Sequence, residues 1–102
     1  MTFKPHKLVL FKKEGCEPCQ KAQEALDSVL NYFPQYEEHV AVMQKENHSA
    51  LVAAYKLETY PTVLVLDRQC DEIKRGVGYK NLTIDFWHKA LSKIHKLEKE
   101  CD

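Results

Sequence analysis

Two cysteines three residues apart are the part of this sequence best suited to chemistry. They are Cys16 and Cys19, with Glu17 and Pro18 between them. Thiols at this spacing can form a disulfide with each other, bind a zinc ion or exchange with other disulfides. Only a thiolate attacks a disulfide, so the surroundings of the two sulfurs decide what they do.

The pair lies between an apolar run and a helical pattern. Leu8–Phe11 is apolar throughout, which is typical of a strand buried on both faces. From residue 17 to residue 33, apolar residues recur at helical spacing, and Pro34 ends the pattern. Cys16 is therefore expected at the N-cap of a helix, where unpaired amide groups and the helix dipole stabilise a thiolate by roughly 0.3–2 kcal/mol. We expect Cys16 to be the nucleophile.

The residues around the nucleophile adjust its reactivity. Cys19 lies one turn further into the helix, so we expect it to be less exposed and to resolve the mixed disulfide. The Glu17 carboxylate disfavours a thiolate at Cys16, and the lysines at 12 and 13 offset part of this effect. Pro18 restricts the first turn without removing a needed hydrogen-bond donor. The combined effect of these neighbouring residues predicts that the protein is a reductant rather than a strong oxidant.

Two other interpretations of the cysteines are inert core thiols and half of a zinc site. Zinc needs two more ligands, and the remaining cysteines and histidines are scattered along the sequence. We therefore expect no metal. No role is assigned to Cys70, in a polar turn, or to Cys101, near the C-terminus. The histidines expected to be surface or packing residues are His39, His48, His88 and His95.

The rest of the sequence supplies further strands and helices. Residues 36–43 end in the apolar run Val40–Met43, which predicts a second strand. Asn47 is the expected N-cap of a helix that runs through Tyr55. The remaining elements are a buried strand at Val63–Leu66, a turn at Asp67–Asp71, a polar edge strand at Glu72–Val77 and a helix from Leu82 to about Leu97. The core side of the second helix is expected to hold Ala50, Leu51, Ala54 and Leu57.

The order of these elements is strand, helix, strand, helix, strand, strand, helix. The first two strands are joined by a helix and should be parallel, whereas the last two are joined by a short turn and should be antiparallel. The sequence therefore predicts an α/β fold with a mixed four-stranded sheet and three helices. A chain of 102 residues fits a single domain over residues 1–102.

At this point the chain resembles the thioredoxin superfamily. The likeness is carried by Leu8–Phe11 running into Gly15–Cys19, and by the later segment in which Tyr60-Pro61-Thr62 opens an apolar strand. Val77-Gly78 is similar to the glycine after the family's last strand. The resemblance implies a thioredoxin-like fold, a cis Pro61 and a Tyr60 backbone that pairs with an incoming substrate strand.

Three departures from the family pattern stand out. Gly15 replaces the tryptophan that usually precedes the first cysteine, and Leu10 replaces a buried aspartate. The strand and helix that open full thioredoxins have no counterpart before Cys16. This shorter layout is similar to glutaredoxins, but residues 76–79 do not show their pattern for holding glutathione. With Leu10 beneath the site, we expect Cys19 to lose its proton slowly, or to water, Glu14 or Glu17.

Charge and hydropathy narrow the function classes. Acidic and basic residues balance at 15 each, which gives no electrostatic attraction to nucleic acid or to an anionic membrane. The apolar runs are far shorter than a membrane span, and the first seven residues do not resemble a secretory signal. A cytoplasmic monomer with no bound cofactor is therefore expected.

Three functions are compatible with these features. The first is a thiol-disulfide oxidoreductase that reduces protein disulfides and receives electrons from a separate reductase or from glutathione. The second is a glutathione-dependent, glutaredoxin-like protein. The third is a thioredoxin-like binding module with little redox turnover, which the departures at Gly15 and Leu10 keep open.

Overall fold

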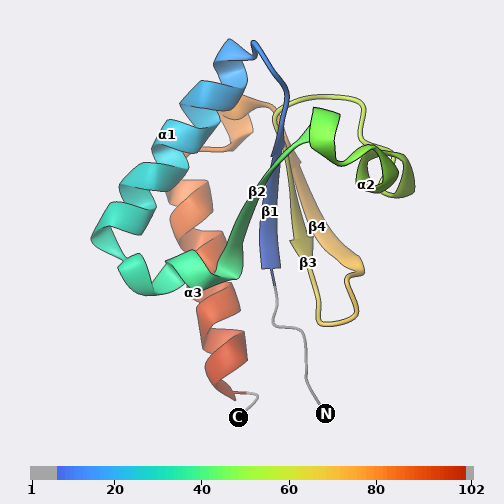
Figure 1. Ribbon diagram of the computed structural model, residues 1–102. Helices are drawn as coiled ribbons and strands as arrows, with labels where there is room; N and C mark the ends of the chain where they lie inside the picture. The colour runs from blue at the N-terminus through green and yellow to red at the C-terminus, as the bar shows by residue number, and fades with distance from the viewer. Residues whose placement is uncertain (1–6, 101–102) are drawn as a thin grey trace.

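A four-stranded sheet forms the centre of the computed structural model, which describes residues 7–100 (Figure 1). The strands are β1 (Lys7–Lys12), β2 (Val40–Gln44), β3 (Thr62–Leu66) and β4 (Glu72–Val77), and the α-helices are α1 (Glu17–Tyr32), α2 (Ser49–Ala54) and α3 (Ile84–Glu100). Short 3-10 helices at η1 (Pro34–His39), η2 (Lys45–Asn47) and η3 (Tyr79–Asn81) complete the connections. Cys101 lies outside the described residues. So do residues 1–6, most of the segment that was expected not to be a secretory signal.

The sheet has the strand order β2-β1-β3-β4. β1 pairs with β2 in parallel and with β3 antiparallel, and β3 pairs antiparallel with β4, so the predicted mixed sheet is confirmed. β4 is an exposed, polar edge strand, as predicted. In the β1–β3 register, Phe11 lies opposite Thr62. The end of β1 that leads to Cys16 therefore lies beside the start of β3, which follows Pro61.

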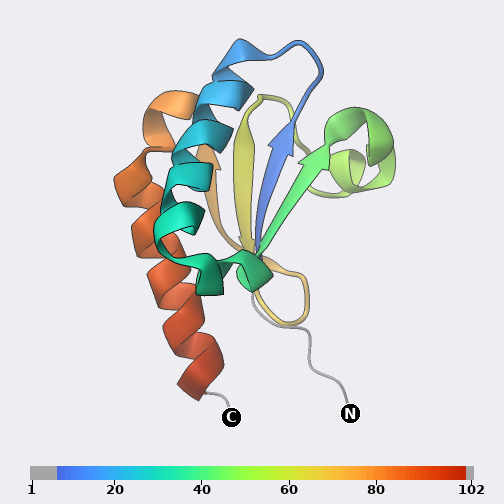
Figure 2. The ribbon, with the colours of Figure 1, turned by 60° about the vertical axis from the view of Figure 1, so that its left-hand side comes forward.

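Helices cover both faces of the sheet, with α1 and α3 on one face and α2 on the other (Figures 1 and 2). Side chains alternate between the faces along β1 because successive residues of a strand point in opposite directions. Leu8 and Leu10 pack in the core beneath α1 and α3, whereas Val9 and Phe11 pack in the core beneath α2. None of the helices within residues 7–100 combines the length and apolar composition needed to cross a membrane.

Residues 36–39 differ from the prediction, because they form part of η1 rather than the start of a strand. Tyr36 and His39 are both buried there, at the three-residue spacing that a 3-10 helix places on one side. Tyr36 Oη lies 3.2 Å from Ser92 Oγ of α3. Contacts with a helix distant in sequence thus favour the helical turn, and the strand begins only at Val40.

The second helix is shorter than predicted, and Asn47 does not cap it. Asn47 belongs to η2, and the residue at the N-cap of α2 is His48, which makes no capping hydrogen bond through its side chain. Ala50 and Ala54 are exposed, contrary to expectation. The side chains of this segment that pack against the sheet are those of Leu51, Val52, Tyr55 and Leu57.

The ends of the two long helices shift slightly from their predicted positions. α1 ends at Tyr32, with Phe33 as its C-cap and Pro34 immediately after. α3 begins at Ile84 rather than Leu82, and the Phe86 amide donates to Thr83 Oγ1 at 3.2 Å in its first turn. Leu82 is nevertheless buried, as its apolar character requires.

Candidate active site

The loop after β1 delivers Cys16 to the start of α1. Gly15 has φ 68°, a left-handed conformation that glycine adopts at little cost, and it turns the chain into the helix. Cys16 then has extended backbone angles and occupies the N-cap, as predicted, while the helix begins at Glu17. The strand therefore fixes where the loop starts, and the helix fixes where the first sulfur lies.

Cys16 and Cys19 form a disulfide, with their Cα atoms 5.2 Å apart. The Cys19 amide donates to Cys16 Sγ at 3.1 Å, so a backbone N–H of the first turn is aimed at the first sulfur. The same amide would stabilise negative charge on that sulfur in the reduced protein, together with the helix dipole. Cys16 is 6% exposed and Cys19 is 1% exposed, so Cys19 is the more buried of the two, as expected.

The two residues between the cysteines face solvent. Glu17 and Pro18 are both exposed, and Pro18 occupies the first turn of α1, where no intrahelical partner for its nitrogen is required. Because Glu17 is exposed, water and salt screen its charge. Lys12 Nζ donates to Gln23 Oε1 of α1 at 3.0 Å, which holds this cation along the side of the helix.

Pro61 lies at the same end of the sheet, and its peptide bond with Tyr60 is cis. Pro61 is buried, and its carbonyl accepts a hydrogen bond from the Gly78 amide at 2.9 Å. The Thr62 hydroxyl also donates to the Thr59 carbonyl, which closes the turn before β3. The sequence resemblance implied the cis bond, whereas the support from Gly78 is visible only in the structure.

Replacement of Gly78 by alanine tests the backbone conformation in which this amide donates to Pro61, because alanine keeps the N–H group. Gly78 has φ 84° and ψ 141°, a region of backbone conformation that disfavours any residue with a Cβ, although a Cβ there would meet no atom within 4 Å. Gly78→Ala should therefore lower the free energy of unfolding by about 1–3 kcal/mol through backbone strain alone. Urea unfolding measures the change. Lys80→Ala, at an exposed position nearby, is the control and should shift the value by less than about 0.5 kcal/mol. Equal stability of the glycine variant and the wild type would contradict the expectation.

Tyr60 packs next to this turn. Its ring contacts the core beneath α2, and Lys45 Nζ lies 5.4 Å from the ring centroid. Burial raises the pKa of Tyr60, and the negative charge of Glu46 adds to the effect, so the phenol is neutral at neutral pH. The hydroxyl is buried without a hydrogen-bond partner among the described residues. Packing is thus an observed role of the ring, whereas contact with substrate stays a prediction.

Position 10 of β1 is apolar and packs on the α1 side of the sheet. Leu10 is fully buried in a cluster that includes Ala22 and Leu26 of α1, where the family resemblance would place a carboxylate. The nearest acidic residues in sequence, Glu14 and Glu17, are exposed.

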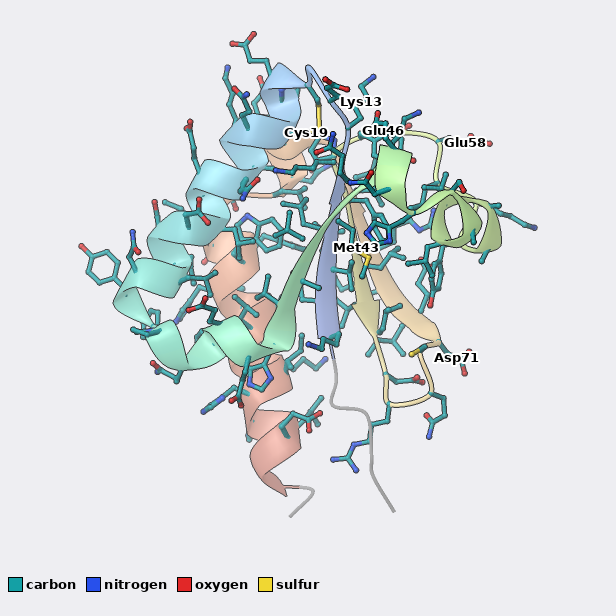
Figure 3. The ribbon with its side chains drawn as sticks, viewed as in Figure 1. Lys13, Cys19, Met43, Glu46, Glu58 and Asp71 are labelled. Carbon is teal, nitrogen blue, oxygen red and sulfur yellow. A yellow bond between two sulfur atoms is a disulfide. The ribbon has the colours of Figure 1, made fainter. Side chains whose placement is uncertain are left out.

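Figure 3 shows Lys13, Cys19 and Glu46 at one end of the molecule and Asp71, in the turn that carries Cys70, at the other. Cys70 is therefore not part of the candidate site.

The sequence did not predict one group of side chains that could bind a ligand. His39 and His95, treated there as scattered residues, lie in contact, with His39 Nε2 and His95 Nδ1 3.0 Å apart. Glu38 completes a cluster with them. They are separated by 56 positions, and no short spacing motif joins them, so only the packing of η1 on α3 brings them together.

These features define a protein with the thioredoxin fold and a CxxC disulfide at the start of its first helix. No family model matches the sequence, and no curated protein matches it. Among solved structures, Fasciola hepatica thioredoxin is similar with a TM-score of 0.70 and 16% identity, over 89% of this chain and 82% of that one. Trypanosoma brucei brucei thioredoxin is similar with a TM-score of 0.69 and 19% identity, over 94% and 80%. Thioredoxin 1 from Thermosipho africanus TCF52B is similar with a TM-score of 0.66 and 22% identity, over 91% and 98%.

Proposed function

We propose that this protein is a thiol-disulfide oxidoreductase that reduces disulfides in protein substrates through Cys16 and Cys19. The observation that supports the proposal most strongly is the position of Cys16 at the N-cap of α1, with the Cys19 amide donating to its sulfur. A sulfur in this position is stabilised as the thiolate when the disulfide is reduced.

The reaction transfers two electrons from the dithiol to the substrate. The Cys16 thiolate attacks one sulfur of a substrate disulfide, forms a mixed disulfide and releases the other substrate sulfur as a thiolate, which takes up a proton. Cys19 then loses its proton and attacks Cys16 Sγ. The disulfide between the two cysteines forms, the second substrate thiolate leaves, and the substrate is reduced.

The substrate is proposed to bind along the turn before β3. Proline has no amide hydrogen, so the Tyr60 backbone next to Pro61 is the part of the turn that would pair with an extended substrate segment. The register that places Thr62 beside Phe11 brings this turn to the end of the sheet from which Cys16 is reached. A separate disulfide reductase or glutathione would restore the dithiol, and a reducing compartment such as the cytoplasm suits this cycle.

Reduction of insulin under two recycling systems tests the proposal. The wild-type protein should accelerate insulin reduction when thioredoxin reductase and NADPH supply electrons. Activity only with glutathione and glutathione reductase would instead assign the glutaredoxin-like alternative. No acceleration in either system would contradict the oxidoreductase proposal.

A partner-binding module is the second candidate, and the burial of Cys16 and Cys19 is the observation that favours it. Cys16, at 6% exposure, is as buried as residues of the core in the disulfide form. If binding is the main role, Cys16→Ser should retain the affinity of the protein for its partners, while the wild type shows negligible turnover with insulin.

A further inference from the structure

A cluster of two histidines and a glutamate lies at the opposite end of α1 from the cysteines. η1 follows the C-terminal end of α1 and packs on α3 (Figure 2). There, His39 Nε2 lies 3.0 Å from His95 Nδ1 and 3.7 Å from Glu38 Oε1. The three ligand atoms all lie within 4.8 Å of one another. Two imidazoles and a carboxylate thus converge on one point from two separate elements.

The separations between these atoms suit a small tetrahedral ion. Zinc binds imidazole nitrogen and carboxylate oxygen at about 2.0–2.2 Å, so two ligand atoms of one tetrahedral ion lie roughly 3.3 Å apart. The observed 3.0 Å and 3.7 Å fall on either side of this value, and small side-chain rotations would equalise them. Glu38 has the freedom to adjust, because its side chain is 74% exposed.

The charge state of His39 also suits metal binding. His39 is 2% exposed, and burial lowers its pKa below the ordinary 6.5, so the ring is neutral at neutral pH, the form in which imidazole binds metals. The charges of Glu38 and Glu98 oppose this lowering, whereas those of His95 and Lys7 add to it. Glu98 follows His95 by one turn of α3 and also lies 3.6 Å from Arg68.

We propose that Glu38, His39 and His95 form a binding site for a divalent transition-metal ion, with zinc as the best match to the ligand set. His39 Nε2, His95 Nδ1 and a Glu38 carboxylate oxygen supply three ligands, and solvent supplies the fourth. The proton that lies between the rings moves to the outer nitrogen of the ring that carried it, so both facing nitrogens present lone pairs. Imidazole ligands select zinc, copper and nickel over magnesium and calcium.

The environment of His39 limits the affinity of the proposed site for a metal ion. Its Nδ1 is buried without a hydrogen-bond partner among the described residues. This nitrogen must carry the proton when Nε2 binds the ion, and it lacks the acceptor that usually orients a metal-bound imidazole. We therefore expect weaker binding than in closed structural zinc sites, but a clear effect on stability, because the ion joins η1 to α3 across 56 positions of sequence.

Calorimetric titration of the 102-residue chain in its disulfide form with Zn²⁺ tests the proposal. In this form Cys16 and Cys19 are bonded to each other and do not compete for the ion. The wild type should bind one Zn²⁺ per chain at this site, and its melting temperature should rise with Zn²⁺ concentration. His95→Gln and Glu38→Gln should each weaken binding by about tenfold or more, whereas His48→Gln, outside the cluster, should not.

Folding and ligand identity are checked separately. Glu38 is exposed, so Glu38→Gln should keep the wild-type circular dichroism spectrum and remain informative even if His95→Gln is destabilised. Titration with Co²⁺ reports the ligands by absorption, and the spectrum should lack the charge-transfer band of thiolate ligation. Absence of binding by the wild type, equal binding by the wild type and Glu38→Gln, or a thiolate band lost in Cys70→Ser would each overturn the proposal.

Discussion

Cys16→Ser is expected to lower the rate of insulin reduction by at least about a thousandfold, because it removes the attacking sulfur. Cys19→Ser should also fail to turn over, but for a different reason. Its Cys16 still attacks substrate, and the mixed disulfide then persists because the resolving sulfur is missing. The two variants therefore separate attack from resolution.

Mass spectrometry without reducing agent distinguishes these two outcomes. Cys19→Ser should accumulate a covalent adduct with substrate through Cys16, and Cys16→Ser should accumulate none. Cys70→Ser, at a thiol in the turn at the other end of the molecule, is the matched control and should keep wild-type turnover. If Cys16→Ser forms the adduct and Cys19→Ser does not, the assigned roles are reversed.

Leu10→Asp is expected to change both the stability of the protein and the rate at which the mixed disulfide is resolved. Leu10→Asp places a carboxylate in an apolar cluster and should lower the free energy of unfolding by about 2–5 kcal/mol. The same carboxylate could accept the proton of Cys19, and resolution of the mixed disulfide should then accelerate by about tenfold or more. Stopped-flow measurement of single-turnover disulfide reduction provides the rate.

Leu10→Asn is the matched control for this change. Asparagine has nearly the size and polarity of aspartic acid but no basic oxygen, so it should destabilise the protein without accelerating resolution. Circular dichroism at the temperature of the kinetic assay gives the folded fraction by which each rate is corrected. Equal corrected rates for Leu10→Asp and wild type would show that proton removal from Cys19 does not limit resolution.

The sequence predicted the part of the site that depends on neighbouring residues. The apolar run Leu8–Phe11 and the helical spacing after residue 17 were enough to place Cys16 at an N-cap, since strand and helix signals meet there. The mixed sheet followed from the order of elements and the lengths of their connections. The cis bond before Pro61 rested on the family resemblance alone, because most bonds before proline are trans.

Features that depend on distant contacts could not be predicted in this way. Tyr36 and His39 form a 3-10 turn because they pack on α3, where each contacts a residue 56 positions later. The meeting of His39 and His95 has the same origin. In α2, alanines at helical spacing were expected in the core, but larger residues fill the space against the sheet and leave Ala50 and Ala54 exposed.

The terminus of α1 is proposed to keep Cys16 reactive in the reduced protein. Alkylation of that form by iodoacetamide at neutral pH, followed by peptide mass spectrometry, tests it most directly. We expect Cys16 to be modified at least about tenfold faster than Cys70, because Cys16 lies at an N-cap with the Cys19 amide donating to its sulfur. Modification of Cys16 at the rate of Cys70, or more slowly, would contradict the account.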